Sequence, residues 1–377
     1  MKMSKGFDSE KYICILGLGY VGLPLCIALS KKYKCIGFDI KKSRVRELQK
    51  GIDKSLESDL KQANTDNLKF TSSLSKLKKC NIFIVAVPTP VDKFNNPDLK
   101  SLKNASLAVA KLIKRGDLVI YESTVFPGAT EEVCLPILER GSNLKLNKDF
   151  YIGYSPERVN PGDKKHSLDK ITKVISGSNK KAIQILKEIY GHVTRNNLFI
   201  AKSIRVAEAA KVIENTQRDL NIALVNELTV LFDALGIDVY DVLRVASTKW
   251  NFLNFEPGLV GGHCIGVDPY YLTYKAKKIG YRPKLILAGR EMNDSMPDYI
   301  SKKIVTQLRQ RKKKINESKV LILGITFKEN CTDTRNSKSI ELYRKLIKVG
   351  AKVKVFDPWV KDFSTEDLFG VRTTKVL

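Results

Sequence analysis

The chain has 377 residues, of which 43% are hydrophobic and 28% charged, a composition typical of a soluble globular protein with two or three domains. Its 66 Lys and Arg residues against 40 Asp and Glu residues give a net charge of +26, which favours anionic partners. The basic residues are dispersed and mostly lysine, and no aromatic ladder or nucleic-acid motif accompanies them. We therefore expect solvated lysine faces and no nucleic-acid binding.

Cysteine usage argues against a disulfide framework and against a zinc site. The seven cysteines are scattered without a C-x-x-C spacing, and the chain has three histidines. This usage fits a reducing cytoplasm. The nearly uncharged stretch 13–29 imitates a secretory signal, but it carries spaced glycines and Pro24 and lacks a cleavage site, so we expect no targeting segment. No other run is long enough to span a bilayer, and membrane insertion is not expected.

The first elements predict a dinucleotide-binding unit. The apolar run Tyr12–Leu16 is followed at once by Gly17-Leu18-Gly19-Tyr20-Val21-Gly22, a helical pattern and a second strand that ends in Asp39, twenty residues after Gly19. The glycines permit a tight turn and close backbone approach, and the helix N-terminus attracts a pyrophosphate. Asp39 would bind the ribose hydroxyls and favour NAD over NADP, a preference that Arg44 could soften.

Two further buried strands, 81–87 and 118–121, continue the alternation of strand and helix. Each ends in a polar loop that contains a threonine, Thr89 in the first and Thr124 in the second. Ligands of doubly wound sheets sit beyond the carboxyl ends of the strands, so both threonines could contact the cofactor. A role in turn or helix capping fits their positions equally well.

A strand at 150–154 leads into Ser155-Pro156-Glu157-Arg158-Val159-Asn160-Pro161-Gly162. An acid beside a base at the end of a strand is typical of a site loop, although a surface loop has the same composition. The stretch 201–235 is then strongly helical, which indicates a spine between domains or a dimer face. Lys211, Asn215 and Arg218 share one face of that helix, which is either a solvated edge or the wall of an anionic site.

The glycine-rich loop 257–269 carries one cysteine, Cys264, with Asp268 four residues later. A thiol needs such an open backbone to act as a nucleophile, but a buried cysteine in a glycine turn is the alternative. Helices at 269–278 and 288–310 follow, and the basic segment 307–314 is predicted to be a linker. A last unit has strands at 319–324 and 352–358 around one helix, too few strands for an independent sheet.

We therefore predict an α/β protein with an N-terminal Rossmann domain, a central helical domain with a long spine helix, and a C-terminal Rossmann-like domain that is incomplete. The predicted boundaries are 1–200, 201–310 and 311–377.

The motifs G-L-G-Y-V-G-L-P, V-P-T-P, S-T-V-F-P-G, S-P-E-R and G-G-H-C-I-G-V-D-P, in this order, resemble the nucleotide-sugar 6-dehydrogenase family over nearly the whole chain. The resemblance implies two NAD-dependent oxidations of a sugar C6 alcohol to a carboxylate. It also implies a dimer contact in the helical domain and a C-terminal domain that binds the nucleotide of the substrate.

The resemblance also implies residue roles. Cys264 would trap the aldehyde as a thiohemiacetal, Lys211 and Asn215 would stabilise the oxyanion, Asp268 and Glu157 would orient or activate water, and Thr124 would help to hold the reacting groups. The implied cofactor contacts are Gly17, Gly19, Tyr20, Val21, Gly22, Asp39, Arg44, Thr89, Thr124 and Arg335. The implied substrate contacts are Glu157, Arg158, Val159, Lys211, Asn215, Arg218, Gly261, Phe327 and Lys328.

The loop around Cys264 is most similar to the branch that acts on UDP-N-acetylhexosamines, whose products feed capsule, O-antigen or related polysaccharides. The residues do not distinguish GlcNAc from GalNAc. UDP-N-acetylmannosamine and UDP-glucose remain alternative substrates. Because family chains generally continue for some tens of residues, a truncated, inactive NAD-binding remnant is a further alternative.

Overall fold

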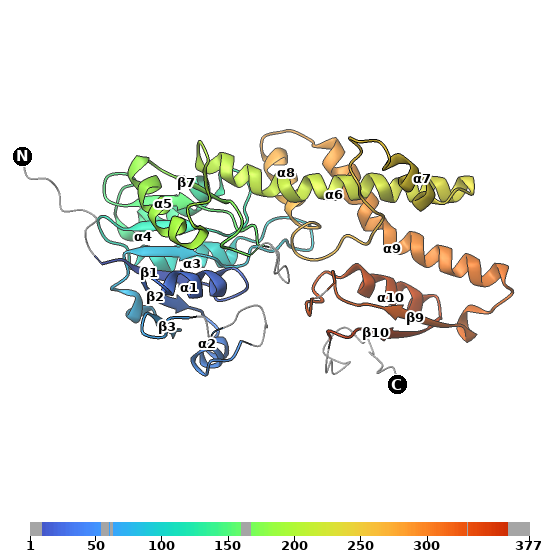
Figure 1. Ribbon diagram of the computed structural model, residues 1–377, viewed down its shortest axis with the longest axis horizontal. Coiled ribbons are helices and arrows are strands. Elements are labelled where there is room, and N and C mark those ends of the chain that lie inside the picture. The colour runs from blue at the N-terminus through green and yellow to red at the C-terminus, as the bar shows by residue number, and fades with distance from the viewer. Residues whose placement is uncertain (1–9, 54–59, 61–62, 160–166, 330, 361–377) are drawn as a thin grey trace, which may run out of the picture. The chain divides into compact units, whose positions relative to one another are not determined.

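The computed structural model describes residues 10–53, 60, 63–159, 167–329 and 331–360. The chain divides into two compact units, residues 1–212 and 213–377, and each is described by itself (Figure 1). Long apolar runs and amphipathic helices alternate in both units, so each unit builds its own core.

The first unit is built on an eight-stranded sheet in the order β3-β2-β1-β4-β5-β6-β7-β8. Neighbouring strands are parallel except β6 and β7, which are antiparallel. The order of its first six strands is that of a Rossmann sheet. The strands are β1 (Tyr12–Leu16), β2 (Lys34–Phe38), β3 (Leu68–Thr71), β4 (Ile82–Val85), β5 (Leu118–Tyr121), β6 (Tyr151–Tyr154), β7 (Lys173–Gly177) and β8 (Leu198–Ile200).

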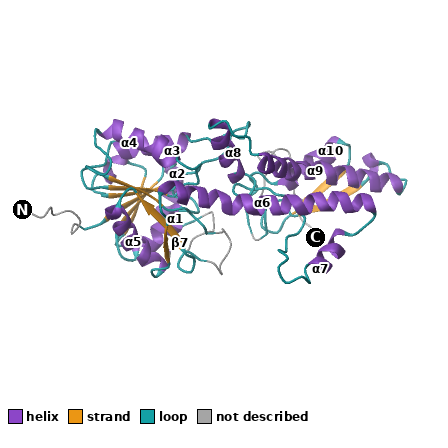
Figure 2. Ribbon diagram, turned by 90° about the horizontal axis from the view of Figure 1, so that it is seen from above, coloured by secondary structure: helices purple, strands orange, loops and turns teal. Residues whose placement is uncertain are grey.

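Helices cover both faces of this sheet (Figure 2). On one face α1 and α5 pack against each other, and α3 and α4 form a second contacting pair. Strands such as β1 and β4 are buried on both sides, which explains their continuous apolar sequences. The helices are α1 (Gly22–Ser30), α2 (Lys42–Gln49), α3 (Lys100–Ala110), α4 (Leu135–Ser142) and α5 (Lys180–Thr194), with short turns η2 (Leu74–Leu77) and η3 (Thr130–Cys134).

The predicted spine helix is present as α6 (Ile204–Leu235), whose 32 residues begin in the first unit and continue into the second. At about 1.5 Å per residue it is roughly 48 Å long. Several large apolar side chains on it are exposed: Val206, Ile213, Leu224, Leu231 and Leu235.

The second unit continues with α7 (Val239–Ala246), α8 (Asp268–Lys278) and α9 (Lys284–Gln310), followed by η4 (Ile315–Glu317), β9 (Lys319–Leu323), α10 (Lys338–Lys348) and β10 (Lys352–Phe356). Strands β9 and β10 pair in parallel, and α10 covers them through a core of Ile340, Tyr343 and Val355. The prediction of a linker from residue 307 was wrong for its first four residues, because α9 continues to Gln310.

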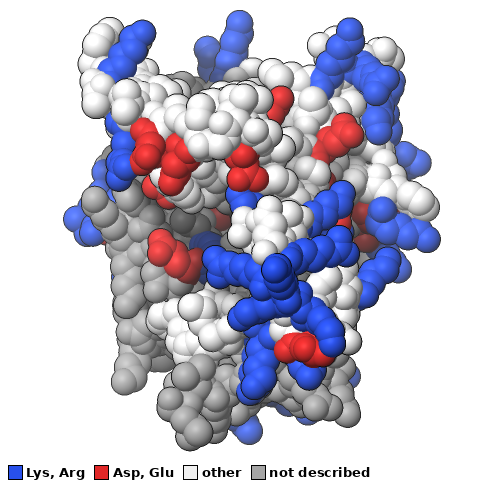
Figure 3. Space-filling model, turned by 90° about the vertical axis from the view of Figure 1, so that its right-hand side faces the viewer, with Lys and Arg blue, Asp and Glu red and all other residues white. Residues whose placement is uncertain are grey.

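Basic side chains predominate over acidic ones on the face of the second unit seen in Figure 3, in keeping with the excess of lysine in the sequence. Among the described residues, no helix is both long and apolar enough to cross a membrane. In the same part of the chain, no group of three or more His, Cys, Asp or Glu side chains is placed to hold a metal ion.

Candidate active site

The turn between β1 and α1 has the shape of a dinucleotide cradle. Gly17 has a φ of +97°, and a Cβ there would lie 2.6 Å from the carbonyl oxygen of Ala86, so only glycine fits without strain. Gly19 is exposed, and a Cβ there would meet nothing within 4 Å. The open space beside Gly19 fits the close approach of a pyrophosphate to the backbone. Tyr20 and Val21, also predicted to contact the cofactor, are half-buried at the start of α1.

Asp39 lies at the tip of β2, beside this turn. Its carboxylate accepts hydrogen bonds from the backbone N–H groups of Leu18 at 3.0 Å and Lys41 at 2.8 Å. Arg44 donates to the carbonyl oxygen of Leu18, and it also pairs with Glu47 at 2.6 Å and Asp53 at 2.8 Å. Two carboxylates thus engage the charge of Arg44, which makes it a poor partner for a 2′-phosphate.

The loops that follow β4 and β5 are joined at the carboxyl edge of the sheet. The hydroxyl of Thr89 donates to the carbonyl oxygen of Thr124 at 2.6 Å, and Ser123 donates to the carbonyl oxygen of Val87 at 2.6 Å. The structure therefore brings together the two threonines that follow these strands. Both side chains are half-buried at the edge where a cofactor binds in sheets of this type.

The loop after Thr124 is held by a buried acid on α6 that the sequence did not single out. The carboxylate of Glu208 accepts hydrogen bonds from the backbone N–H groups of Gly128 at 2.5 Å and Thr130 at 2.9 Å. Burial raises the pKa of Glu208 to about 7, although the hydrogen bonds from Thr130 and Gly128 act in the opposite direction. Glu208 lies one turn before Lys211, so it ties the start of α6 to the Thr124 loop.

Glu157 follows β6 in a loop that folds back on its own carboxylate. One oxygen accepts from the backbone N–H groups of Arg158 at 2.8 Å and Val159 at 2.5 Å, and the other lies 3.4 Å from the ammonium of Lys173. Arg158 donates to the carbonyl oxygen of Thr172 at 3.0 Å. These bonds hold the described part of the predicted site loop, up to Val159, and residues 160–162 of that prediction lie outside the described residues.

In the second unit, the amide nitrogen of Asn215 lies 2.6 Å from a carboxylate oxygen of Asp268, the first residue of α8. The side chain of Asp268 is buried, whereas Arg218 on α6 is exposed. Lys211, one turn before Asn215, is 8% exposed. A buried lysine and a fixed amide on one helical stripe resemble a set of donors more than a solvated edge.

Cys264 is the exposed cysteine of the chain, and the other six are buried. Its carbonyl oxygen accepts hydrogen bonds from the backbone N–H groups of Val267 and Asp268, so the loop closes directly onto the start of α8. An accessible thiol on a fixed backbone suits a nucleophile, and this arrangement favours that interpretation over the buried-cysteine alternative.

The two glycines before His263 pack against the C-terminal segment. Gly262 has a φ of +80°, and a Cβ there would lie 2.5 Å from the ring of Phe327. A Cβ on Gly261 would lie 2.6 Å from the carbonyl oxygen of Asn336, which also accepts a hydrogen bond from the N–H of Gly262. The predicted substrate contacts Gly261 and Phe327 therefore share one corner of the second unit.

The aromatic rings of His263 and Phe327 meet edge to face with their centres 5.3 Å apart, and the ammonium of Lys328 lies 5.7 Å from the centre of the Phe327 ring. Arg335, a predicted cofactor contact, pairs with Asp333 at 2.5 Å. Asp333 also lies 3.6 Å from the imidazole of His263. Charged and aromatic groups of the C-terminal segment thus surround the glycines next to Cys264.

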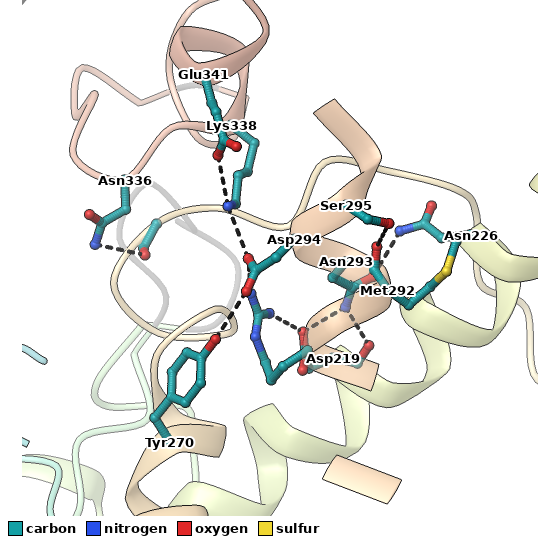
Figure 4. Close-up of polar contacts among 12 residues, drawn as sticks. Asp219, Asn226, Tyr270, Met292, Asn293, Asp294, Ser295, Asn336, Lys338 and Glu341 are labelled. Carbon is teal, nitrogen blue, oxygen red and sulfur yellow. Dashed lines mark hydrogen bonds and ion pairs between the residues drawn. The ribbon is translucent and has the colours of Figure 1, made fainter. Parts of the chain in front are cut away.

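A buried polar network that the sequence did not reveal supports this corner (Figure 4). Arg290 on α9 pairs with Asp219 of α6 and with Asp294, each at 2.6 Å. Asp294 also accepts from the hydroxyl of Tyr270 on α8 and pairs with Lys338 on α10 at 2.9 Å. Four helices are thereby joined, and a Cβ at Gly266 of the Cys264 loop would lie 3.8 Å from the guanidinium of Arg290.

A Rossmann sheet with a glycine cradle and an acid at the tip of β2, together with an exposed cysteine on a fixed loop, defines an NAD-dependent dehydrogenase. Residues 11–194 match the NAD binding domain of the UDP-glucose/GDP-mannose dehydrogenase family, residues 205–295 its central domain, and residues 321–377 its UDP binding domain. The chain belongs to this family.

Two relatives and one solved structure illustrate the similarity. UDP-N-acetyl-D-glucosamine 6-dehydrogenase of Pseudomonas aeruginosa is 53% identical over 358 residues, covering 94% of this chain and 84% of that protein. The Salmonella typhi protein of the same name is 52% identical over 369 residues, covering 97% and 86%. The structure of UDP-D-ManNAc dehydrogenase from Pyrococcus horikoshii superposes with a TM-score of 0.86 at 33% identity, covering 96% of this chain and 87% of that one.

Proposed function

We propose that this protein oxidises the C6 hydroxymethyl group of a UDP-N-acetylhexosamine, either UDP-GlcNAc or UDP-GalNAc, to the carboxylate of the uronic acid. The observation that carries the proposal is the exposed thiol of Cys264 on a loop that Asp268 and Asn215 fix at its end. Similarity to the two UDP-N-acetyl-D-glucosamine 6-dehydrogenases, at 53% and 52% identity, supports a UDP-N-acetylhexosamine over UDP-glucose.

The reaction is a four-electron oxidation in two steps, and NAD held at the glycine turn would supply the hydride acceptor for each step. The C6 alcohol first loses a hydride and a proton to become an aldehyde. The Cys264 thiolate adds to the aldehyde carbon, and the oxygen takes a proton, which gives a thiohemiacetal. Loss of a second hydride and a proton gives a thioester. Water then cleaves the C–S bond, which releases the carboxylate and restores the cysteine.

Each proposed role follows from what the side chain can do. Lys211 and Asn215 supply an ammonium and an amide that would stabilise the oxyanion on C6. Asp268 and Glu157 are carboxylates that would orient or activate the water. The carbonyl oxygen of Thr124 accepts a hydrogen bond from the hydroxyl of Thr89. Thr124 would help to hold the reacting groups.

We also propose which residues bind the two ligands. The cofactor would lie against the cradle, the acid beside it and the threonine loops: Gly17, Gly19, Tyr20, Val21, Gly22, Asp39, Arg44, Thr89 and Thr124, with Arg335 from the C-terminal segment. The nucleotide sugar would contact the S-P-E-R loop, the α6 stripe and the corner around Gly261: Glu157, Arg158, Val159, Lys211, Asn215, Arg218, Gly261, Phe327 and Lys328.

We also propose a homodimer, three functional domains and a cytoplasmic location. The exposed apolar side chains of α6, among them Leu224 and Leu231, support a homodimer that covers them, which light scattering on the purified protein tests. The functional division into NAD-binding, dimerisation and UDP-binding domains would follow residues 1–200, 201–310 and 311–377. The cysteines of the described chain form no disulfide, which supports a cytoplasmic location, and the product would feed a surface polysaccharide.

The test is NADH absorbance with a panel of UDP-GlcNAc, UDP-GalNAc, UDP-N-acetylmannosamine and UDP-glucose. We expect two NADH per sugar with one or both of the first two substrates. Cys264→Ser should still bind NAD but should not complete the oxidation. A folded, NAD-binding sample that turns over none of the four sugars would contradict the proposal.

A further inference from the structure

The first unit contains a fully buried lysine at the edge of the sheet where the cofactor loops lie. Lys173 is the first residue of β7, and its side chain is 0% exposed. Its ammonium lies 3.0 Å from the carboxylate of Glu122, which directly follows β5, and 3.4 Å from that of Glu157, which follows β6. It also donates to the carbonyl oxygen of Pro156 at 3.2 Å.

The topology of the sheet explains this meeting. Because β7 is antiparallel to β6, its first residue lies at the edge where the parallel strands β5 and β6 end. The pairing of Tyr154 with Ser176, continued by three residues, places Glu157 opposite Lys173. The reversal of β7, which its parallel neighbour β8 shares, thus brings the first residue of a strand to the edge where β1–β6 end in loops.

The cluster is built to keep the lysine charged. Burial acts against the ammonium, but the charges of Glu122 and Glu157 outweigh it and raise the pKa of Lys173. Glu122 is itself fully buried and accepts a hydrogen bond from the hydroxyl of Tyr190 on α5. A buried cation between two carboxylates, one of which has a second donor, is a satisfied network.

The two carboxylates differ in what they can do. Glu122 has 0% side-chain exposure, so it serves as the internal counterion of Lys173. Glu157 has 12% side-chain exposure, and one of its oxygens is already held by the N–H groups of Arg158 and Val159. Lys173 holds the second oxygen, so the carboxylate is fixed from both sides and still reaches solvent.

We propose that Lys173, held by Glu122, is a positioning residue that fixes the Glu157 carboxylate in the orientation in which it orients or activates the hydrolytic water. The inference rests on the role proposed above for Glu157. Lys173 does not touch the substrate; it sets the direction in which the free lone pairs of Glu157 point. A carboxylate without this cation would turn within its loop, and water would attack the thioester more slowly.

The experiment compares Lys173→Met with Glu157→Gln, with the double variant and with the unaltered chain, using UDP-GlcNAc or whichever sugar the panel identifies. We expect Lys173→Met to lower kcat by about 100-fold while the KM for NAD changes by less than about threefold. Mass spectrometry should detect the acylated Cys264 peptide during turnover in both single variants. In the Glu157→Gln background, Lys173→Met should cause no further loss.

Tyr190→Phe is the matched control, because it removes a buried donor from the same Glu122 but leaves Lys173 on Glu157. It should retain kcat within about threefold of the unaltered chain. If Tyr190→Phe reproduces the loss, or if the losses of Lys173→Met and Glu157→Gln multiply in the double variant, the cluster is structural and the inference is wrong.

Lys173→Gln removes the cation but keeps a donor for Glu122, and it replaces Lys173→Met in the same comparison if Lys173→Met does not bind NAD. The inference is supported if this variant lowers kcat in the unaltered chain but causes no further loss in the Glu157→Gln background. It is overturned if the variant is fully active, or if it also lowers kcat in the Glu157→Gln background. The two proposals fail in different ways. An unaltered, NAD-binding chain without turnover on any UDP-sugar contradicts the proposed function, whereas an active chain with independent losses contradicts the positioning role alone.

Discussion

Asn215 donates a 2.6 Å hydrogen bond to the carboxylate of Asp268 and so ties the middle of α6 to the first residue of α8. The backbone N–H of Asp268 in turn donates to the carbonyl oxygen of Cys264 at 2.8 Å. The loop that carries the proposed nucleophile is therefore anchored to a residue of the spine helix through one buried aspartate. Asp268 is the first residue of α8, and the N-terminus of a helix stabilises a carboxylate there.

Replacement of Asn215 by alanine should weaken both the fold and the reaction. The loss of the hydrogen bond to buried Asp268 is expected to cost about 1–3 kcal/mol of unfolding free energy. If the amide also stabilises the oxyanion, kcat should fall by about 100- to 1,000-fold.

Asn221→Ala is the control, because Asn221 is on the same helix and donates to the backbone of Gln217. Its unfolding free energy should change by less than about 0.5 kcal/mol. Equal kcat values in the two variants would rule out the catalytic role.

Local sequence patterns predicted the elements that depend on neighbouring residues. The glycine turn, β1, β2 and the position of Asp39 follow from one contiguous stretch, and the structure joins Asp39 to Leu18 across 21 residues. The buried partners could not be predicted in this way. Arg290 meets Asp219 across 71 residues, and Lys173 meets Glu122 across 51. Such pairs depend on how the helices cross and on the reversed direction of β7. Neither can be predicted from a local sequence pattern.

Asp39→Asn should relax the choice between NAD and NADP. The substitution keeps an acceptor for the backbone N–H of Leu18 but removes the charge that repels a 2′-phosphate. We expect the ratio of kcat/KM for NAD to that for NADP to fall by about 10- to 100-fold. Asp66→Asn, which changes an exposed aspartate of the same unit, should leave the ratio unchanged. An unchanged ratio in Asp39→Asn would exclude Asp39 from ribose recognition.

Gly262→Ala should be more damaging than a matched glycine replacement elsewhere in the second unit. Gly262 and Gly280 both have a positive φ, +80° and +77°, so alanine at either position should cost about 1–2 kcal/mol of strain. A Cβ at Gly280 meets nothing within 4 Å, whereas one at Gly262 would lie 2.5 Å from the Phe327 ring. We expect a further cost of about 1–3 kcal/mol and a loss of activity for Gly262→Ala alone.

Denaturant unfolding of the two glycine variants measures this difference. A second substitution, Phe327→Ala, should recover part of the extra cost in the Gly262→Ala background but none in the Gly280→Ala background. Equal stabilities of the two single variants would show that Phe327 does not pack on the loop in solution.

The buried carboxyl of Glu208 should make stability depend on pH. Its folded pKa of about 7 lies above the ordinary value of 4.5, because burial penalises the charged form. The folded state therefore binds the proton more tightly than the unfolded state. The stabilisation is complete below the unfolded pKa and is lost as pH rises towards and through the folded value, by about 3 kcal/mol at most.

Glu208→Gln removes this titration, so the difference in unfolding free energy between the unaltered chain and the variant should shrink as pH rises from 4.5 to 7. Glutamine also places an amide against one of the N–H groups of Gly128 and Thr130, so the variant should be the less stable of the two at low pH. Glu132→Gln, an exposed change in the same segment, should give a difference that does not vary with pH. If the difference in unfolding free energy between the unaltered chain and Glu208→Gln is also constant with pH, Glu208 is ionised throughout this range. The hydrogen bonds that its carboxylate accepts from the two backbone N–H groups would then stabilise the charge.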